Sequence, residues 1–359
     1  MPPPATLTYR ATPTVRLNGA DDERIANLIT HLAMTESEGG LSALELRLSN
    51  SASLTTGSAE YAFDASGDLA VGAALIVGAG DSSAPAEIFR GYVTGLEGVF
   101  DEGGPPSFVI LAEDALQKLR FKRRTAVYEN QSIADIVQQI ASDHGLSPQV
   151  TGLSQNFGTQ VQMNESDLAF LRRLLARVDG DLQIVGTDLQ AAARADLGRG
   201  ELELTLGDQL KSARVTADLA HQITQATVKG WDVSGGSAMN GDGQENALGP
   251  GEGQKGGEAM DEAFGARPHH TCHEITFNQS EVDALANSVR NARARRFVRV
   301  VGVAVGDPAL RVGTNVKLHG LGDWFSNTFR VVRTQHLFDL TEGYRTEFAG
   351  ECAFLGRSS

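Results

Sequence analysis

Apolar and polar side chains alternate along much of the first third of the chain. Leu44, Leu46 and Leu48 are separated by Glu45 and Arg47, which is the period-two pattern of a half-buried strand. Further short apolar runs, each followed by a turn rich in glycine, lie at 75–77, 88–96 and 108–111. Closely spaced short strands of this kind are typical of a sandwich or barrel, and we predict a first β-barrel over residues 1–115.

The period becomes helical between residues 116 and 200. Ser132 can cap a helix whose apolar residues 133, 136, 137, 140 and 141 share one face, and Gly145 is placed to end it. A second helix follows Asn164, with a stripe of leucines and Gly180 just beyond its end. Short strands lie between and after the helices. We therefore predict a small α+β domain over residues 116–200.

Strand-like alternation returns after Gly200 and continues to the end of the chain. Residues 202–206 and 225–231 are candidate strands, and four more follow at 297–305, 315–318, 329–338 and 344–354. A helix fits residues 280–296, where Ser280 and Asp283 form an approximate capping box. These elements predict a second β-barrel over residues 201–359.

The segment 234–269 interrupts this pattern. Nine of the 23 residues from Gly235 to Gly257 are glycine, mixed with Asn, Asp, Gln and Glu. Such a composition buries little apolar surface to offset the entropy lost on ordering. We expect a long flexible insertion in the second barrel, acting as a tether or gasket that orders on contact with a partner.

The order of elements near residue 100 recurs near the C-terminus. Both regions begin with a Val-Gly pair, Val71-Gly72 in one and Val312-Gly313 in the other. In each region a short strand, a glycine turn and a long strand follow. The pattern does not establish a residue register. The simplest explanation is two tandem, similar barrels with the α+β unit between them.

The charge balance excludes some classes of function. Lys and Arg total 31 against 45 Asp and Glu, a net charge of −14, which argues against specific nucleic-acid binding. The N-terminus lacks the features of a signal peptide, and the longest apolar run, 69–80, is too short to span a bilayer. We expect a soluble chain made in a reducing compartment, with Cys272 and Cys352 unpaired.

No motif predicts catalysis or a cofactor. His269, His270, Cys272 and His273 are the densest candidate metal ligands, but they lie within five residues and no second pair stands nearby, whereas zinc sites usually combine two separated pairs. The glycine spacing over 251–256 lacks the flanking strand and helix of a dinucleotide site. Paired carboxylates are interpreted as solvated turn formers. We therefore expect no enzyme, no cofactor and no metal.

Two basic clusters and one aromatic pair are candidate partner contacts. The arginines are Arg123 and Arg124 in one cluster, and Arg295 and Arg296 at the end of the predicted helix. Trp324 and Phe325 are adjacent at a predicted hairpin, where strand geometry would leave one of them outside the core. We expect these six residues at contacts between subunits or with partner proteins.

Five short stretches, taken in order and spacing, resemble the baseplate hub proteins of contractile phage tails. The family is the phage late control gene D family, similar also to the N-terminal hub part of type VI secretion spike (VgrG) proteins. The likeness spans nearly the whole chain but each stretch is short. The stretches are 87–94 (EIFRGYVT), 114–119 (DALQKL) with 132–136 (SIADI), 162–171 (QMNESDLAFL), 228–231 (VKGW) and 343–346 (GYRT).

The resemblance implies a structural role. Members are built from two similar β-barrels and a small α+β unit and form homotrimers, so that six barrels make a pseudo-six-fold ring. Such a hub adapts the six-fold tail tube to a three-fold spike and closes the channel before contraction. The implied partners are the tail tube protein, a separate trimeric spike protein, the tape-measure protein and the baseplate wedge.

This chain departs from VgrG proteins at its C-terminus, because it ends at Ser359 without the needle that those chains carry. We expect the spike to be a separate protein. The expected location is the tail tip of a phage or phage-like particle assembled in the bacterial cytoplasm. A cell-wall-degrading enzyme and a glycan-binding barrel are the alternatives, and the sequence leaves open whether the particle is a phage, a bacteriocin or an injection system.

Overall fold

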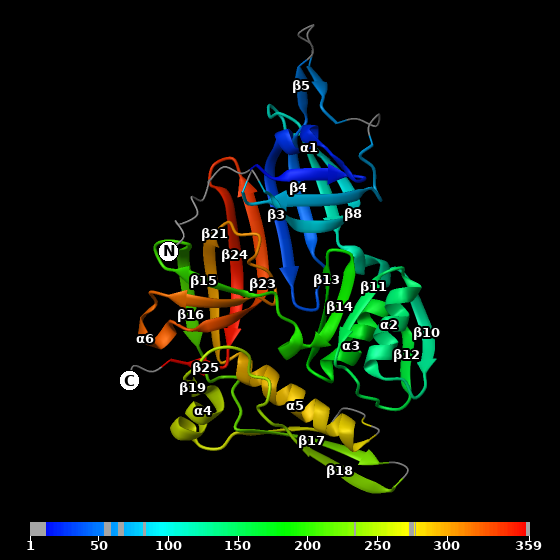
Figure 1. Cartoon of the computed structure of the whole chain (residues 1–359), viewed down its shortest axis with the longest axis vertical. Coiled ribbons are helices and arrows are strands. Elements are labelled where there is room, and N and C mark those ends of the chain that lie inside the picture. The colour runs from blue at the N-terminus through cyan, green and yellow to red at the C-terminus, as the bar shows by residue number, and fades with distance from the viewer. Residues whose placement is uncertain are drawn as a thin grey trace.

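The structure is a computed structural model that describes residues 12–53, 59–63, 68–81, 84–232, 235–272, 276 and 278–356. The fold is mainly β, with large antiparallel sheets and a few helices (Figure 1). No helix in these ranges is long and apolar enough to cross a membrane. The expected mainly β fold with an α+β part is thus confirmed at this level.

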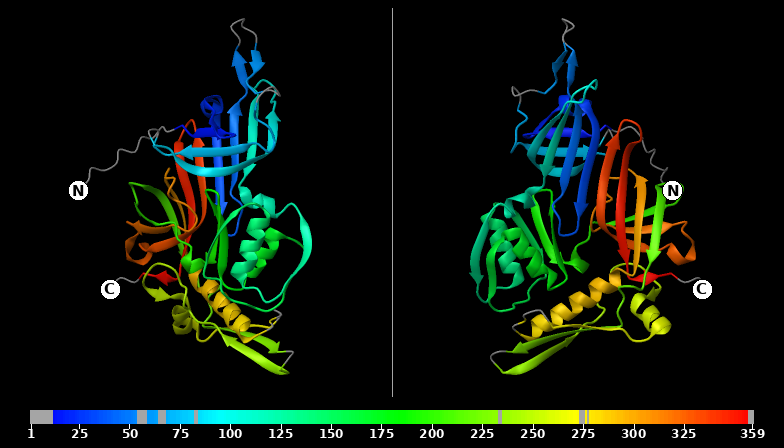
Figure 2. Two further views of the ribbon diagram at one scale, coloured as in Figure 1. Left: turned by 45° about the vertical axis from the view of Figure 1, so that its right-hand side comes forward. Right: turned by 180° about the vertical axis from the view of Figure 1, so that it is seen from behind.

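The first part of the chain forms an antiparallel sheet topped by a projecting hairpin, β5–β6 (Figures 1 and 2). Its elements are β1 (Thr14–Leu17), β2 (Ala20–Asp21), α1 (Glu23–Leu28), β3 (Ile29–Ser37), β4 (Ala43–Ser49), β5 (Ser51–Ser53), β6 (Ala59–Tyr61), β7 (Ala74–Ala79), β8 (Ala86–Val99) and β9 (Ser107–Glu113).

The middle part packs two helices against short sheets. Its elements are η1 (Ala115–Leu119), β10 (Arg123–Tyr128), α2 (Ile133–Asp143), β11 (Ser147–Thr151), β12 (Gln160–Ser166), α3 (Asp167–Ala176), β13 (Gly180–Val185), β14 (Asp188–Ala193) and η2 (Arg194–Asp196). Ser132 and Asp135 form the capping box of α2, so this helix begins where the sequence predicts.

The last part contains most of the remaining sheet and the longest helix. Its elements are β15 (Glu201–Thr205), β16 (Leu210–Ala217), β17 (Gln225–Asp232), β18 (Ser237–Asp242), β19 (Gln254–Lys255), α4 (Gly256–Phe264), β20 (Pro268–Thr271), α5 (Gln279–Arg295), β21 (Val298–Val305), β22 (Asn315–His319), α6 (Gly322–Phe325), β23 (Thr328–Asp339), β24 (Gly343–Cys352) and β25 (Phe354–Leu355).

The first and last parts share one continuous sheet of 13 strands. Strand β3 pairs antiparallel with β23 in the order β16-β21-β24-β23-β3-β4-β9-β8-β7-β1-β2, and β15 joins through β22 (Figure 1). The apolar core under the first half of the sheet includes Phe338 and Tyr344 from the C-terminal strands. The two halves are therefore joined by backbone hydrogen bonds and by shared packing.

The repeated order of elements has a matching hydrogen-bond pattern. In the first half, Gly72 N donates to Val93 O at 2.7 Å and Val93 N donates to Ala73 O at 2.9 Å. The pairing of β8 with β9 then shifts register between Val93 and Gly95. Gly72 has φ +92°, a conformation that glycine adopts without strain.

The second half repeats this arrangement. Gly313 N donates to Val331 O at 2.9 Å, and Val331 N donates to Thr314 O at 2.9 Å. The pairing of β23 with β24 shifts register between Val331 and Arg333, and Gly313 has φ +90°. The structure thus supplies the residue register that the sequence pattern lacks, with Gly72 equivalent to Gly313 and Val93 to Val331.

The glycine-rich segment, expected to be a long flexible insertion, contains regular elements. Its described residues form β18, β19, α4 and β20, with Met239 and Met260 buried. Several of its glycines lie where backbones approach closely: a Cβ on Gly243 would overlap the Ala286 carbonyl oxygen, and one on Gly241 would lie 2.9 Å from Val282 O. The glycines therefore permit close packing against α5, a role that composition alone does not distinguish from flexibility.

Candidate interaction surfaces and the buried junction

A buried carboxylate joins three parts of the chain at the end of β3. Glu36 accepts hydrogen bonds from Arg199 Nη1 at 2.7 Å, from Arg311 Nε at 2.9 Å and from the Val312 backbone N–H at 3.1 Å. Arg199 follows the middle part, whereas Arg311 and Val312 precede β22. Glu36 is only 4% exposed, so these contacts replace its hydration.

The charges around Glu36 determine its protonation state. Burial by itself raises the pKa of a carboxyl group, but the guanidinium groups of Arg311 and Arg199 outweigh it and lower the pKa of Glu36 to about 2. Glu36 is therefore ionised near neutral pH. It holds two cations that would otherwise repel each other inside the protein.

Two residues further along, Glu38 behaves in the opposite way. It forms an ion pair with Arg194, and its other oxygen lies 3.8 Å from Arg330 Nε. Burial raises the pKa of Glu38 to about 7, aided by the nearby carboxylates Asp181 and Glu351. This side of the junction changes its charge near neutral pH.

Helix α5 is attached to the middle part by a further set of polar contacts. Arg295 makes two hydrogen bonds of 2.6 Å with the Asp179 carboxylate, and Ser288 Oγ donates to Ala176 O at 2.8 Å. Arg177 pairs with Glu281, whose side chain is fully buried. All three parts of the chain therefore meet through charged and polar groups as well as through the sheet.

The candidate metal ligands are not brought together. His269 is half-buried on β20, while His270 and Cys272 are exposed. His273 lies outside the described residues. In the described part of the chain no group of three His, Cys, Asp or Glu side chains could hold a metal ion.

The four candidate contact arginines lie in different environments. Arg123 is exposed, whereas Arg124 pairs within the chain with Asp167 at 2.7 Å. Arg296 is exposed and lies 3.3 Å from Glu351. Arg295 is only 4% exposed, because its side chain turns toward the middle part and pairs there with Asp179.

The aromatic pair lies on a single helical turn, α6, instead of the expected hairpin strand. Trp324 is 52% exposed and Phe325 is half-buried. The expectation that one of the two leaves the core therefore matches the exposure of Trp324, although the reason is a helical turn and not strand alternation. Its role as a partner contact stays a prediction.

The structure also exposes apolar residues that the sequence analysis missed. Val127 and Val161 are cross-strand partners on β10 and β12, and Met163 is 73% exposed beside them. The alternating polar positions Gln160 and Gln162 are buried instead, and Gln162 Nε2 donates to Asp167 Oδ1 at 2.8 Å. The alternating pattern located the strand but did not show which of its faces is buried. The polar face is buried here because its amide side chains form hydrogen bonds inside the protein. We call Val127, Val161 and Met163 the outer apolar strip.

Several solved structures share this fold. The 43 kDa tail protein of prophage MuSo2 from Shewanella oneidensis is 15% identical with a TM-score of 0.71, over 96% of this chain and 98% of that one. The tail protein from Neisseria meningitidis MC58 is 10% identical with a TM-score of 0.67, over 96% of each chain. At these low sequence identities, the structural likeness establishes only that the chain shares the fold of these two phage tail proteins.

A third structure extends the fold to secretion machinery. This is the E. coli c3393 protein, a component of the type VI secretion system with structural similarity to the T4 bacteriophage tail proteins gp27 and gp5. It is 12% identical with a TM-score of 0.60, over 96% of this chain and 79% of that one.

None of the curated proteins matches the chain in sequence. A family model described as the Alg8 N-terminal domain matches residues 48–339, which is well over half of the chain. The chain therefore belongs to the Alg8 N-terminal domain family.

Proposed function

We propose that this protein is the structural hub of a contractile tail baseplate. The observation that carries the proposal is the internal repeat, in which Gly72 and Val93 match Gly313 and Val331 within one continuous sheet. A chain that carries the same unit twice allows three copies to present six similar units. That is the number needed to join a six-fold tube to a three-fold spike.

In this proposal the protein acts through its interfaces and has no catalytic residues. Its partners are two further copies of itself, the tail tube protein and a separate spike protein, at the tip of a phage or phage-like particle. The net charge of −14 suits a channel through which cargo slides without sticking. The hub closes this channel until the sheath contracts.

The outer apolar strip is a candidate subunit contact. Exposed apolar residues that lie together on one face commonly mark an interface. Val127, Val161 and Met163 lie beside the exposed Arg123, one of the candidate contact residues. Burial of this strip against another copy would supply hydrophobic free energy, and the arginine would lie at the rim.

The test is the molar mass in solution by light scattering, alone and with the candidate spike protein. We expect about 114 kDa, three times the chain mass of 38.1 kDa, either directly or on adding spike. The double variant Val161→Lys, Met163→Lys should fold but lose the trimer, whereas Phe264→Lys, an equally exposed apolar residue on α4, should keep it.

A chain that stays monomeric at high concentration and ignores the spike would contradict the hub. A peptidoglycan zymogram on the same sample separates the proposal from a wall-degrading enzyme, because the hub should leave peptidoglycan intact.

A further inference from the structure

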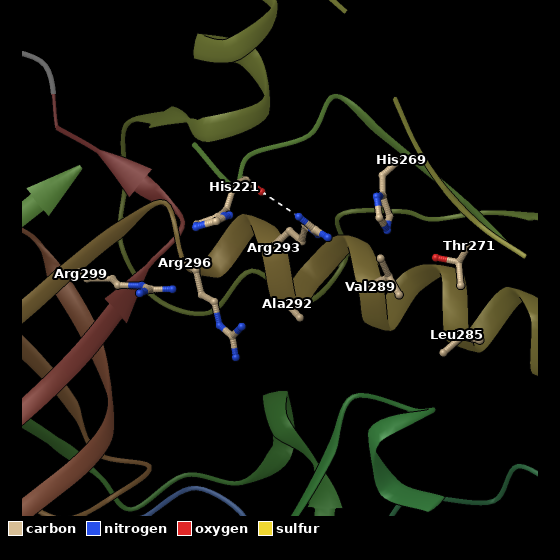
Figure 3. A pocket seen from close by; sticks show the side chains of 9 residues that line it. All are labelled: His221, His269, Thr271, Leu285, Val289, Ala292, Arg293, Arg296 and Arg299. Atoms are coloured by element: carbon tan, nitrogen blue, oxygen red, sulfur yellow. Dashed lines mark hydrogen bonds between the residues drawn. The ribbon is translucent and has the colours of Figure 1, made fainter. Parts of the chain in front are cut away.

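One face of α5 lines a cavity outside the junction described above. Other faces are occupied: Val282 and Ala286 pack with Val228 and Met239, and Ser288 contacts the middle part. Leu285, Val289 and Ala292 follow one another at helical spacing and are half-buried, and Leu285 also packs against that cluster. They form the apolar floor of a cavity of about 550 Å³ (Figure 3).

The walls of this cavity are basic although the chain is acidic. Arg293, Arg296 and Arg299 lie at one end, and two histidines approach from other segments (Figure 3); the complete lining is His221, His269, Thr271, Leu285, Val289, Ala292, Arg293, Arg296 and Arg299. No carboxylate is among these described residues. One nearby carboxylate, Glu351, pairs with Arg296 and is the cross-strand partner of Arg299, which leaves three arginines against one carboxylate. Positive charge is therefore concentrated here in a chain of net charge −14, which attracts an anionic ligand.

An edge strand borders the same cavity. β20, which contributes His269 and Thr271 to the lining, is the last strand of the sheet β18-β17-β20. It pairs with β17 along one edge, and within the described residues no strand pairs with its other edge. Such an edge presents backbone carbonyl oxygens and the N–H groups of its non-proline residues to an added extended segment, whereas Pro268 at its start has no N–H.

We propose that this cavity binds an extended acidic peptide segment of a partner protein. Its carboxylates pair with Arg293 and Arg299, alternate apolar side chains pack on Leu285, Val289 and Ala292, and its backbone pairs with β20. A peptide fits better than single-stranded nucleic acid, because the described lining contains no Phe, Tyr or Trp on which bases could stack. The inference goes beyond the hub role and does not depend on it.

The experiment is fluorescence anisotropy with the full chain and a labelled octapeptide of alternating glutamate and valine. The peptide with lysine in place of glutamate is the matched control ligand. We expect binding of the acidic peptide that weakens as salt is raised, and Arg299→Gln or Arg293→Gln should weaken it about tenfold by removing a charge-assisted contact. Val289→Asp, which places a carboxylate on the apolar floor, should weaken it more.

Two further controls test the site itself. Arg16→Gln removes an exposed arginine on β1, in the first part of the chain, and should leave the affinity unchanged. Methylation of alternate backbone nitrogens in the peptide should abolish binding, because it removes the donors that pair with β20. Circular dichroism of each variant confirms that it is folded.

Several outcomes would overturn the proposal. Absence of binding at millimolar peptide, equal binding of the lysine peptide, or an equal loss with Arg16→Gln would each refute the site. Preferential binding of a single-stranded oligonucleotide would assign the cavity to nucleic acid. The molar mass is also followed without peptide as the protein concentration is raised. A rise in mass that is absent in Arg299→Gln would assign the cavity to a second copy of this chain.

Discussion

At the scale of single residues, two glutamates two positions apart, Glu36 on β3 and Glu38 just after it, have opposite electrostatic roles. Glu36 accepts hydrogen bonds from two arginines and a backbone N–H, whereas Glu38 shares its surroundings with Asp181 and Glu351. The number of cations around each carboxylate, relative to the cost of burial, determines whether its charged form is favoured.

We predict that Glu36→Gln lowers the free energy of unfolding by about 3–5 kcal/mol, because it leaves two buried guanidinium groups without their counter-ion. Urea denaturation at pH 7 measures the loss. Glu45→Gln is the control: its carboxylate is 43% exposed and lies 3.9 Å from Arg47, so its removal should cost at most about 0.5 kcal/mol. Equal effects of the two changes would contradict the junction.

We predict that Glu38 makes the protein less stable as the pH rises. Its pKa in the folded protein is about 7, above the value of 4.5 of an ordinary glutamate, so the folded state retains its proton while the unfolded chain loses it. This contribution to stability is complete below pH 4.5 and is lost as the pH passes through 7. Glu38→Gln should thus match the wild type at pH 4 and exceed it by about 1–3 kcal/mol at pH 8.

In the same pH series, Glu36 serves as the control, because its contribution to stability changes with pH in the opposite direction to that of Glu38. Its pKa is lowered to about 2, so its contribution is present above pH 4.5 and disappears as the pH falls toward 2. Denaturation curves collected from pH 3 to pH 8 separate the two residues. A Glu38→Gln variant with an unchanged pH profile would exclude the raised pKa.

At the scale of elements, glycines hold the segment before α5 close to that helix. The described part of 234–269 carries β18 and α4, and Gly243 lies against the Ala286 carbonyl. Close backbone approach thus explains some of the glycines that composition assigns to flexibility.

We predict that Gly243→Ala lowers the free energy of unfolding by about 1–3 kcal/mol, because the added methyl group overlaps the α5 backbone. Gly198→Ala is the control, since a Cβ there has no neighbour within 4 Å. Limited proteolysis should cut the Gly243→Ala variant sooner between β18 and α4. Equal protection in the two variants would favour a flexible segment over a packed one.

At the scale of the whole molecule, the chain folds back so that its last strands complete the core of its first. β23 pairs with β3, and Phe338 and Tyr344 belong to the core under the N-terminal strands. Long-range pairing of this kind couples the stability of the two halves.

We predict that Phe338→Ala destabilises both halves together, by about 3–5 kcal/mol. Hydrogen exchange should rise in β4 and β8 as well as in β23, and calorimetry should still show one transition for the sheet. Leu340→Ala, a change to a side chain that is 73% exposed in the turn after β23, is the matched control. Faster exchange confined to β23 and β24 would show that the halves are energetically independent.

The sequence by itself determined the local features. Alternation located most strands, the Ser132 cap and its apolar stripe located α2, and the order of elements revealed the repeat, because period and capping depend on residues close together in the chain. The tertiary structure alone decided which faces are buried, which arginines pair internally, and how the halves join. Gln162 is buried while Val161 is exposed, Arg295 turns inward to Asp179, and β3 meets β23, because each depends on partners distant in sequence that no local pattern encodes.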